Sequence, residues 1–223
     1  MIENWRILLY YPLGLLPALF FTLRLLIQWF QSEKEKRSLV TPVFWKLSLT
    51  GNILQLLHYF IQVQYPFALL QTSNAMMSWR NLSMIHASKR CSTGFFLFQL
   101  LASMIVVTLC FVLQSYFLIG EIDWIRTPTK FWDAARVHHS LGWHIFGTIG
   151  GVLFASRFWM QWWQSECSQQ SELSRSFWWL SIIGSTISLS YFIHINDVVS
   201  VLQYGVGLIP YFRNLVLIRR NSQ

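Results

Sequence analysis

The segments RLLIQWFQSE (residues 24–33) and RFWMQWWQSE (residues 157–166) decide the fold, because the second repeats the first 133 residues later. Both carry Arg, Gln, Trp, Gln, Ser and Glu in one register. The agreement continues without a gap from Phe44-Trp45 and Phe177-Trp178 to Arg80-Asn81-Leu82 and Arg213-Asn214-Leu215. We therefore predict that the chain contains two copies of one structural unit.

The composition indicates that lipid surrounds most of the chain. Of its 223 residues, 54% are hydrophobic and 12% are charged, whereas a soluble domain is roughly 25% charged. The net charge of +8 does not indicate nucleic-acid binding, because the basic residues form short clusters between apolar segments. Cys91, Cys110 and Cys167 have no CxxC spacing, so we expect neither a disulfide framework nor a zinc site.

Seven segments are long and apolar enough for a helix that crosses a bilayer, which takes about 20 residues. Each copy of the repeat holds three of them, and one additional segment links the copies. Because three spans are an odd number, the linker helix restores the orientation of the second copy, and the repeat is parallel. The predicted spans are residues 7–30, 43–63, 66–85, 95–119, 143–163, 177–195 and 198–218.

The predicted fold class is all-α integral membrane, with seven transmembrane helices as two parallel three-helix repeats plus a linker helix. We divide the chain into a first repeat (residues 1–90), a linker helix with an amphipathic outer segment (residues 91–142) and a second repeat (residues 143–223). Residues 121–140 are expected to form a short amphipathic helix at the outer interface. The first apolar segment is expected to stay as a helix, because no signal-peptide cleavage site follows it.

The distribution of Lys and Arg predicts how the chain is oriented. One face receives twice as many basic residues as the other, and the positive-inside rule assigns the richer face to the cytoplasm. The N-terminus is therefore predicted outside and the C-terminus inside. The richer face has Lys34, Lys36, Arg37, Lys89, Arg90, Arg175, Arg219 and Arg220, and the other has Arg6, Arg126, Lys130 and Arg136.

The repeated pattern R-x3-QW-x-QSE, followed by a serine, FW-x-LS-x2-G and RNL, resembles the lipid A biosynthesis N-terminal domain family over nearly the whole chain, twice. The resemblance implies a SemiSWEET or PQ-loop topology, here duplicated into a SWEET-like 3+1+3 arrangement, in the bacterial inner membrane. In some bacteria this domain is fused ahead of lipid-A-disaccharide synthase. The sequence has no βαβ alternation and no Gly-rich phosphate loop, so we do not expect it to be catalytic alone.

A polar stripe runs along the first helix of each copy. Arg24, Gln28 and Gln31 lie at i, i+4 and i+7 on one helix face, and Arg157, Gln161 and Gln164 repeat the spacing. An arginine within a span costs several kcal/mol unless it is paired or reaches the interface. We consider two roles: a clamp onto helix ends or carboxylates of neighbouring helices, or a cytoplasm-facing cavity for an anionic head group, since the guanidinium fork suits phosphate.

The candidate substrate-binding residues share repeated positions near the predicted cytoplasmic ends of the helices. Glu33 and Glu166 are expected either to hold the stripe arginines or to pair with Lys34, Lys36 or Arg175. An additional polar stripe on the third helix, Gln71, Asn74 and Ser78, has only Gln203 near its register in the second copy. The candidates are Arg24, Gln28, Gln31, Glu33, Arg80, Asn81, Arg157, Gln161, Gln164, Glu166, Arg213 and Asn214.

The histidines supply weaker alternatives. His138, His139 and His144 are close together in the sequence, but neither repeat contains the whole cluster, so we expect no metal ligands and no cofactor. His58 and His194 lie in or near the predicted membrane region. We consider two roles for them, a buried histidine held by hydrogen bonds and a member of a proton relay. No paired carboxylates recur in both copies, so no catalytic residue is assigned.

These features lead to three hypotheses about function. The first is a membrane module of lipid A (lipopolysaccharide) biosynthesis that binds or positions a phosphorylated or lipid-linked glycan at the cytoplasmic leaflet, with lipid-A-disaccharide synthase or a similar cytoplasmic glycosyltransferase as partner. The second is a SWEET-like transporter of small solutes or lipid-linked sugars. The third is synthase activity of the chain itself, which family membership would imply. Membrane lipids are expected partners, and nucleic acid is not.

Overall fold

The structure is a computed structural model that describes residues 2–36, 40–85, 92–120, 122, 124–125, 139–168 and 173–220. The described part is all-helical, which confirms the all-α part of the predicted class. Seven α-helices and one π-helical turn are present in these residues, and an isolated bridge joins Gln64 to Ile125. The predicted amphipathic helix of residues 121–140 falls largely outside the described residues.

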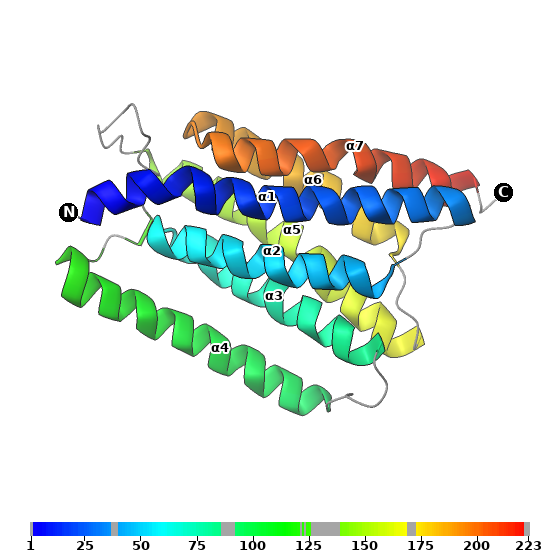
Figure 1. The fold of residues 1–223 in the computed structure, drawn as a ribbon, viewed down its shortest axis with the longest axis horizontal. Helices are drawn as coiled ribbons and strands as arrows, with labels where there is room; N and C mark the ends of the chain where they lie inside the picture. The colour runs from blue at the N-terminus through cyan, green and yellow to red at the C-terminus, as the bar shows by residue number, and fades with distance from the viewer. Residues whose placement is uncertain are drawn as a thin grey trace.

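The helices lie alongside one another in a single elongated bundle (Figure 1). Most of them are longer than the predicted spans, because helical hydrogen bonding continues past the point where apolar composition ends, whereas α2 ends two residues before its predicted span does. Their bounds are α1 Ile2–Glu35, α2 Pro42–Ile61, α3 Tyr65–Ile85, α4 Thr93–Gln114 with the π-helical turn η2 Ser115–Ile119, α5 Leu141–Ser168, α6 Arg175–His194 and α7 Val198–Arg220.

Contacts between the helices follow the duplication. In the first repeat α1 packs on α2 and α2 on α3, and in the second α5 packs on α6 and α6 on α7. The repeats meet along two seams, α1 against α7 and α3 against α5, which are equivalent positions in the two copies. α1 and α5 run in the same direction, and α4 lies at the edge of the bundle against α3 (Figure 1).

The turns inside the repeats have the same backbone conformation. Val63, between α2 and α3, and Asn196, between α6 and α7, have φ of 58° and 56°. The amide of the following residue then donates to a carbonyl five residues earlier, Gln64 to Tyr59 and Asp197 to Phe192, both at 2.9 Å. A β-branched valine is unfavourable in this left-handed region. Its presence there shows that packing of the buried turn overrides the local preference.

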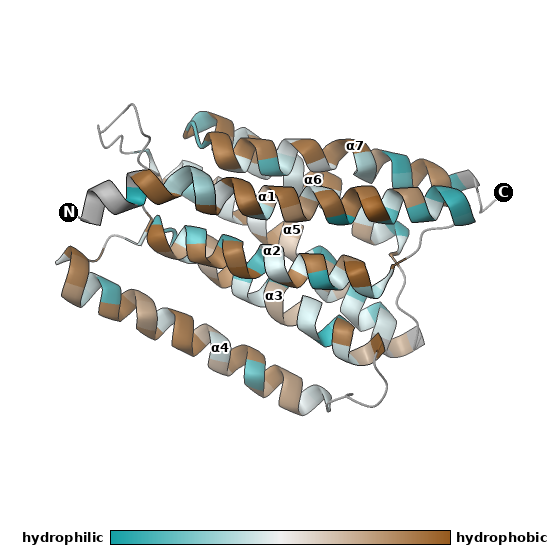
Figure 2. Ribbon diagram, viewed as in Figure 1, coloured by the Kyte–Doolittle hydropathy of each residue, from teal (hydrophilic) through white to brown (hydrophobic). Residues whose placement is uncertain are grey.

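Apolar side chains cover the outside of the bundle, and polar side chains fill its inside. Exposed large apolar residues occur along the whole of α4, for example Leu101, Ile105 and Leu109, and brown bands run along the outer helices in Figure 2. Arginine, glutamine and asparagine side chains are buried within the bundle. This distribution is the reverse of a soluble protein and suits a bilayer, where backbone and polar groups must be satisfied internally.

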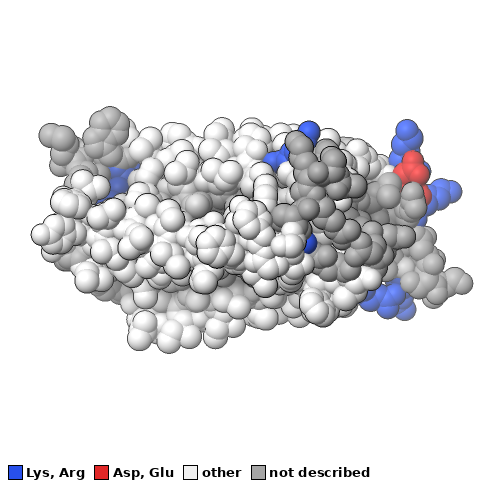
Figure 3. Space-filling model, turned by 90° about the horizontal axis from the view of Figure 1, so that it is seen from below, with Lys and Arg blue, Asp and Glu red and all other residues white. Residues whose placement is uncertain are grey.

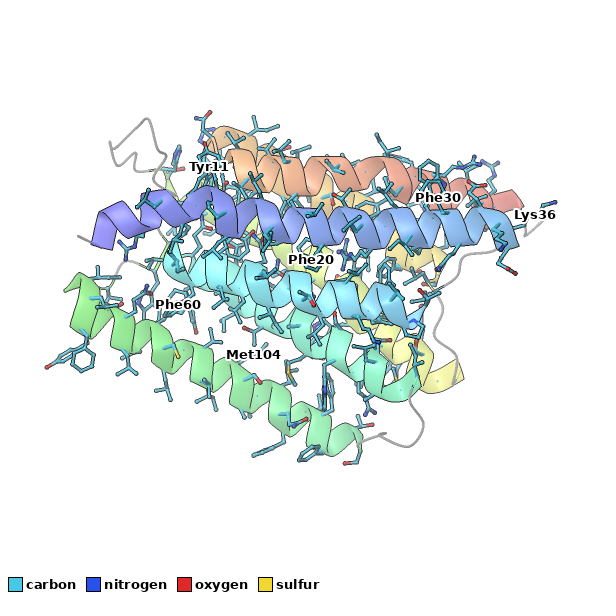
Figure 4. All side chains as sticks on the ribbon, viewed as in Figure 1. Tyr11, Phe20, Phe30, Lys36, Phe60 and Met104 are labelled. Carbon is cyan, nitrogen blue, oxygen red and sulfur yellow. The ribbon has the colours of Figure 1, made fainter. Side chains whose placement is uncertain are left out.

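Four helices in the described residues are long and apolar enough to cross a membrane by length and composition: Leu8–Glu35, Thr93–Ile119, Arg175–His194 and Val198–Arg219. α2, α3 and α5 do not meet this criterion of length and composition. They contribute buried polar side chains such as Gln55, Asn81 and Gln161, which lower the average hydropathy of the helix without facing lipid. On the face seen in Figure 3, acidic and basic side chains gather mainly toward the end where α1 ends.

Candidate functional site

Arg24 and Arg157, the two arginines of the repeated motif, line one cavity at the centre of the bundle. α1 supplies Arg24 and α5 supplies Arg157, and α2, α3 and α7 complete the wall. The cavity has a volume of about 20 Å³, which is room for a water molecule and too little for a sugar. Its other polar lining residues are Thr22, Asn52, Gln71, Asn74, Gln203, Tyr204 and Tyr211.

Arg24 is buried, and none of the described acidic side chains is paired with it. Its Nη1 donates to the Oγ of Ser48 on α2 at 2.8 Å, and its Nε makes no hydrogen bond. The guanidinium lies over the rings of Phe21, Phe44 and Phe158, at 4.7, 5.2 and 5.6 Å from their centroids. Aromatic faces attract a cation, but they do not neutralise its charge.

Arg157 occupies the equivalent position on α5 with different neighbours. Its Nη1 donates to the hydroxyl of Tyr211 on α7 at a long 3.4 Å, and its Nε is also without a partner. The guanidinium lies 3.3 Å from the centroid of Phe154 and 4.6 Å from that of Phe158. Phe158 is therefore shared by both cations. Within the described side chains, neither arginine forms an ion pair.

The stripe glutamines do not line the cavity, and two of them, Gln28 and Gln161, instead join the two repeats. Gln28 on α1 exchanges two hydrogen bonds with Asn214 on α7, of 3.1 and 3.3 Å, and also donates to Ser32 at 2.9 Å. In the equivalent seam, Gln161 donates to Asn81 at 3.0 Å and to Ser165 at 2.9 Å. All four amide side chains are at most 1% exposed. They form a matched pair of buried clamps.

Glu33 pairs with a third-helix arginine, not with Arg24. Its Oε1 accepts from the Nε of Arg213 on α7 at 2.7 Å and from Trp29 at 3.0 Å. The side chains of Glu33 and Arg213 are each 36% exposed, so they lie at the end of the bundle. This pairing was not among the alternatives for Glu33, because contact between α1 and α7 is not visible in the sequence.

The remaining candidates also lie away from the cavity. Arg80 is buried, with its guanidinium 5.6 Å from the ring centroid of Phe96 on α4. Gln31 and Gln164 are partly buried, and the carbonyl oxygen of each side chain makes no hydrogen bond. The side chain of Glu166 lies outside the described residues.

Five further cavity residues were predicted from the sequence only as members of a polar stripe, or were not predicted at all. Gln71, Asn74 and Gln203 line the wall as the stripe suggested, while Ser78 accepts a hydrogen bond from Asn52 at 3.2 Å. Tyr204 and Tyr211 are seven residues apart on α7, a helical spacing that could have indicated a shared face. They were missed because the first copy has Gln71 and Ser78 at these positions.

The histidines near the start of α5 form an aromatic cluster. His139 and His144 have ring centroids 6.5 Å apart, and the ring of His194 lies 5.0 Å from His139 and stacks on Trp143. Burial and the neighbouring His194 lower the pKa of His139, which favours a neutral imidazole. His138 lies outside the described residues. Within the described ranges, no group of three or more His, Cys, Asp or Glu could hold a metal.

These features define a duplicated all-helical protein with helices of membrane-spanning length, an apolar exterior and a cationic polar interior. The chain belongs to the lipid A biosynthesis N-terminal domain family, whose model matches it twice, at residues 13–83 and 146–216. The two matches begin 133 residues apart, which is the offset of the repeat in the sequence. The internal duplication and the predicted family are thus confirmed.

Relatives named lipid-A-disaccharide synthase are similar to nearly the whole chain. The protein from Chlamydia felis is 38% identical over 213 residues, which are 96% of this chain and 34% of the relative. The proteins from Chlamydia abortus and Chlamydia pneumoniae are 35% and 34% identical over 223 residues, all of this chain and 35% and 36% of theirs. The chain therefore spans about a third of the length of these relatives. No solved structure matches it.

Proposed function

We propose that the chain is a membrane-spanning module of bacterial lipid A biosynthesis, in which Arg24 and Arg157 bind the phosphate of a phosphorylated or lipid-linked glycan. The observation that carries this proposal is the pair of buried guanidinium groups in one cavity, with no carboxylate paired to either within the described side chains. Removing a charge from water costs several kcal/mol. An anion between the two guanidinium groups would offset that cost through charge-assisted hydrogen bonds.

The ligand is expected to enter from the cytoplasmic leaflet. Arg24 lies nine residues before Glu33 on α1, or about 13 Å by helical rise, and basic residues such as Lys34 and Arg219 surround that end. The positive-inside rule then places this end in the cytoplasm, with all seven helices crossing the membrane. Because the cavity holds about 20 Å³, a phosphate requires the guanidinium groups to rotate or the repeats to separate.

The module is proposed to present its ligand to a glycosyltransferase and not to perform the transfer itself. The relatives named lipid-A-disaccharide synthase are about three times as long as this chain, so the reaction in their name does not have to reside in the shared third. The proposed partner is a cytoplasmic glycosyltransferase of that class, and the expected site is the inner membrane.

The test is the lipid content of the gently purified chain, measured by mass spectrometry. We expect phosphorylated glycolipid to be enriched over the bulk membrane in the natural chain, and the enrichment to disappear in the double variant Arg24→Gln/Arg157→Gln. Arg213→Gln is the matched control, because Arg213 lies at the bundle end and does not line the cavity. Equal lipid profiles for the natural chain and the double variant would overturn the proposal.

Transport is the second candidate, because unpaired buried polar groups continue beyond the arginines toward the other end of the bundle. Gln55, His58 and Ser188 are each at most 1% exposed and have polar atoms without hydrogen bonds. Uptake of a phosphorylated sugar into proteoliposomes, lost in the double arginine variant, would favour transport over positioning. Glycosyl transfer by the purified chain alone would favour an enzyme.

A further inference from the structure

A buried carboxylate lies at the opposite end of the bundle from the RxxxQWxQSE motifs. Asp197, in the turn between α6 and α7, is 1% exposed. Its Oδ1 accepts from the hydroxyl of Tyr10 on α1 at 2.6 Å and from the amide of Ser200 at 3.2 Å, and its Oδ2 accepts from the Ser200 hydroxyl at 2.9 Å. The Tyr10 bond joins residues 187 positions apart and fastens the first repeat to the second.

A histidine that has no hydrogen-bond partner among the described residues lies near this carboxylate. His58 on α2 is 1% exposed, and neither Nδ1 nor Nε2 makes a hydrogen bond. Its ring centroid is 5.6 Å from that of Tyr10. An added Cβ at Gly14 would meet both His58 and Val199, so the imidazole lies near Val199, and it is within electrostatic reach of Asp197. A neutral imidazole always carries one donor and one acceptor, and leaving both unpaired in a buried site is unfavourable.

The arrangement occurs in only one of the two seams. At an offset of 133 residues, Tyr10, His58 and Ser200 correspond to Trp143, Tyr191 and Phe67, and Asp197 corresponds to Gln64. Tyr191, the equivalent of His58, instead shares a 2.8 Å hydrogen bond with His144 of α5, within the second repeat. The two repeats thus have equivalent residues at the end with the glutamine–asparagine clamps and different residues at this end. The difference indicates a role that only the seam between α1 and α7 performs.

Other titratable groups around Asp197 are phenols and one arginine. Arg6, one turn before Tyr10 on α1, donates from Nε to the carbonyl of Ile61 at 3.1 Å, at the end of α2. The phenols lie within electrostatic reach of Asp197 or of one another, and they are Tyr10 and Tyr11 from α1, Tyr59 from α2, Tyr191 from α6 and Tyr204 from α7. Phenols stay neutral between pH 5 and 8, whereas histidine is the side chain whose charge ordinarily changes in that range.

We infer that His58 and Asp197 form a proton-binding site, and that a proton taken up by this pair releases Tyr10 and loosens the seam between α1 and α7. A proton on Asp197 removes the charge that the Tyr10 hydroxyl bonds to. A proton on His58 creates an imidazolium that competes with Tyr10 for the carboxylate. Either position weakens the same hydrogen bond. The inference is independent of anion binding by the central arginines.

The test measures how fast a thiol beneath this contact reacts as the pH changes. Cys91, Cys110 and Cys167 are replaced by serine, and Val199→Cys and Val198→Cys are made separately in that background. Val199 is fully buried and its neighbour Val198 is 41% exposed. Both thiols are labelled with a water-soluble maleimide, and the rate at position 199 is divided by the rate at position 198. This ratio reports opening of the seam between α1 and α7, because the effect of pH on thiol ionisation is common to both rates.

We expect the ratio to rise about tenfold as the pH falls from 8 to 5. Loss of one hydrogen bond to a charged acceptor changes the opening equilibrium by about this factor. Tyr10→Phe and Asp197→Asn should give a high ratio that is insensitive to pH, and His58→Gln should abolish the rise or move it to lower pH. Tyr10→Phe removes a single hydroxyl, so it keeps the test valid if Asp197→Asn does not fold. His144→Gln, which changes the buried histidine of the second repeat, is the control that should keep the response.

Three results would overturn the inference. One is a ratio that does not change with pH in the starting background. Another is a rise that survives in both Tyr10→Phe and Asp197→Asn, or that His144→Gln abolishes. The third is a ratio that follows the sodium concentration at constant pH, because the ligand would then be a metal cation and not a proton.

Discussion

The buried clamp between Gln28 and Asn214 gives the sharpest test of how the two repeats are held together. Asn214→Leu removes both hydrogen bonds between the amide groups, of 3.1 and 3.3 Å, and leaves the buried Gln28 amide with Ser32. An unsatisfied buried polar group costs about 1–3 kcal/mol. Because Ser32 still satisfies one donor, we expect about 1–2 kcal/mol.

Thermal unfolding in detergent is the assay. For a chain of this size, each kcal/mol shifts Tm by about 2–4 °C, so Asn214→Leu should lower Tm by roughly 2–8 °C. A double-mutant cycle with Gln28→Met isolates the interaction itself. Hydrogen bonds between membrane helices average about 0.6 kcal/mol in such cycles, with a maximum near 1.7 kcal/mol, and two bonds should give about 1–2 kcal/mol of coupling.

The second seam supplies an internal comparison. Gln161→Met and Asn81→Leu disrupt the equivalent contact, a single cross-repeat hydrogen bond of 3.0 Å, and should show coupling of the same sign and about half the size. Coupling within about 0.3 kcal/mol of zero in both seams, which is the scatter expected for independent sites, would refute the reasoning. The repeats would then be held by apolar packing alone.

Two further changes test the packing and the bundle end. Gly184→Ala should be more destabilising than Gly51→Ala at the equivalent position. At Gly184 the added Cβ would lie 2.5 Å from the backbone nitrogen of Phe154, whereas at Gly51 it would lie 2.6 Å from the Phe21 ring, which can move. Equal losses of Tm would contradict this. Glu33→Gln should lower stability by less than about 1 kcal/mol, because exposed ion pairs contribute little and Glu33 is 36% exposed. A larger loss that high salt does not reduce would show that Glu33 has another role.

The sequence determined the duplication, the helical class and which residues share a helix face. Identical spacing of Arg, Gln, Trp and Glu in the two motifs is local information, and helical periodicity alone puts Arg24 and Gln28 on one stripe. The same reasoning predicted that Gln71, Asn74 and Gln203 belong to polar faces, and all three line the cavity. These predictions succeeded because each depends on residues within one helix.

Only the tertiary structure decided which side chains meet. Gln28 contacts Asn214, and Glu33 contacts Arg213, across 186 and 180 residues, because α7 packs on α1 and α3 on α5. Which helices adjoin depends on the packing of whole faces, which periodicity does not encode. The cluster of Asp197, Tyr10 and His58 shows the same limit. Its members have no equivalent in the repeat, so the pattern gave no reason to associate them, and the packing of α1 against α2 and α7 brought them together.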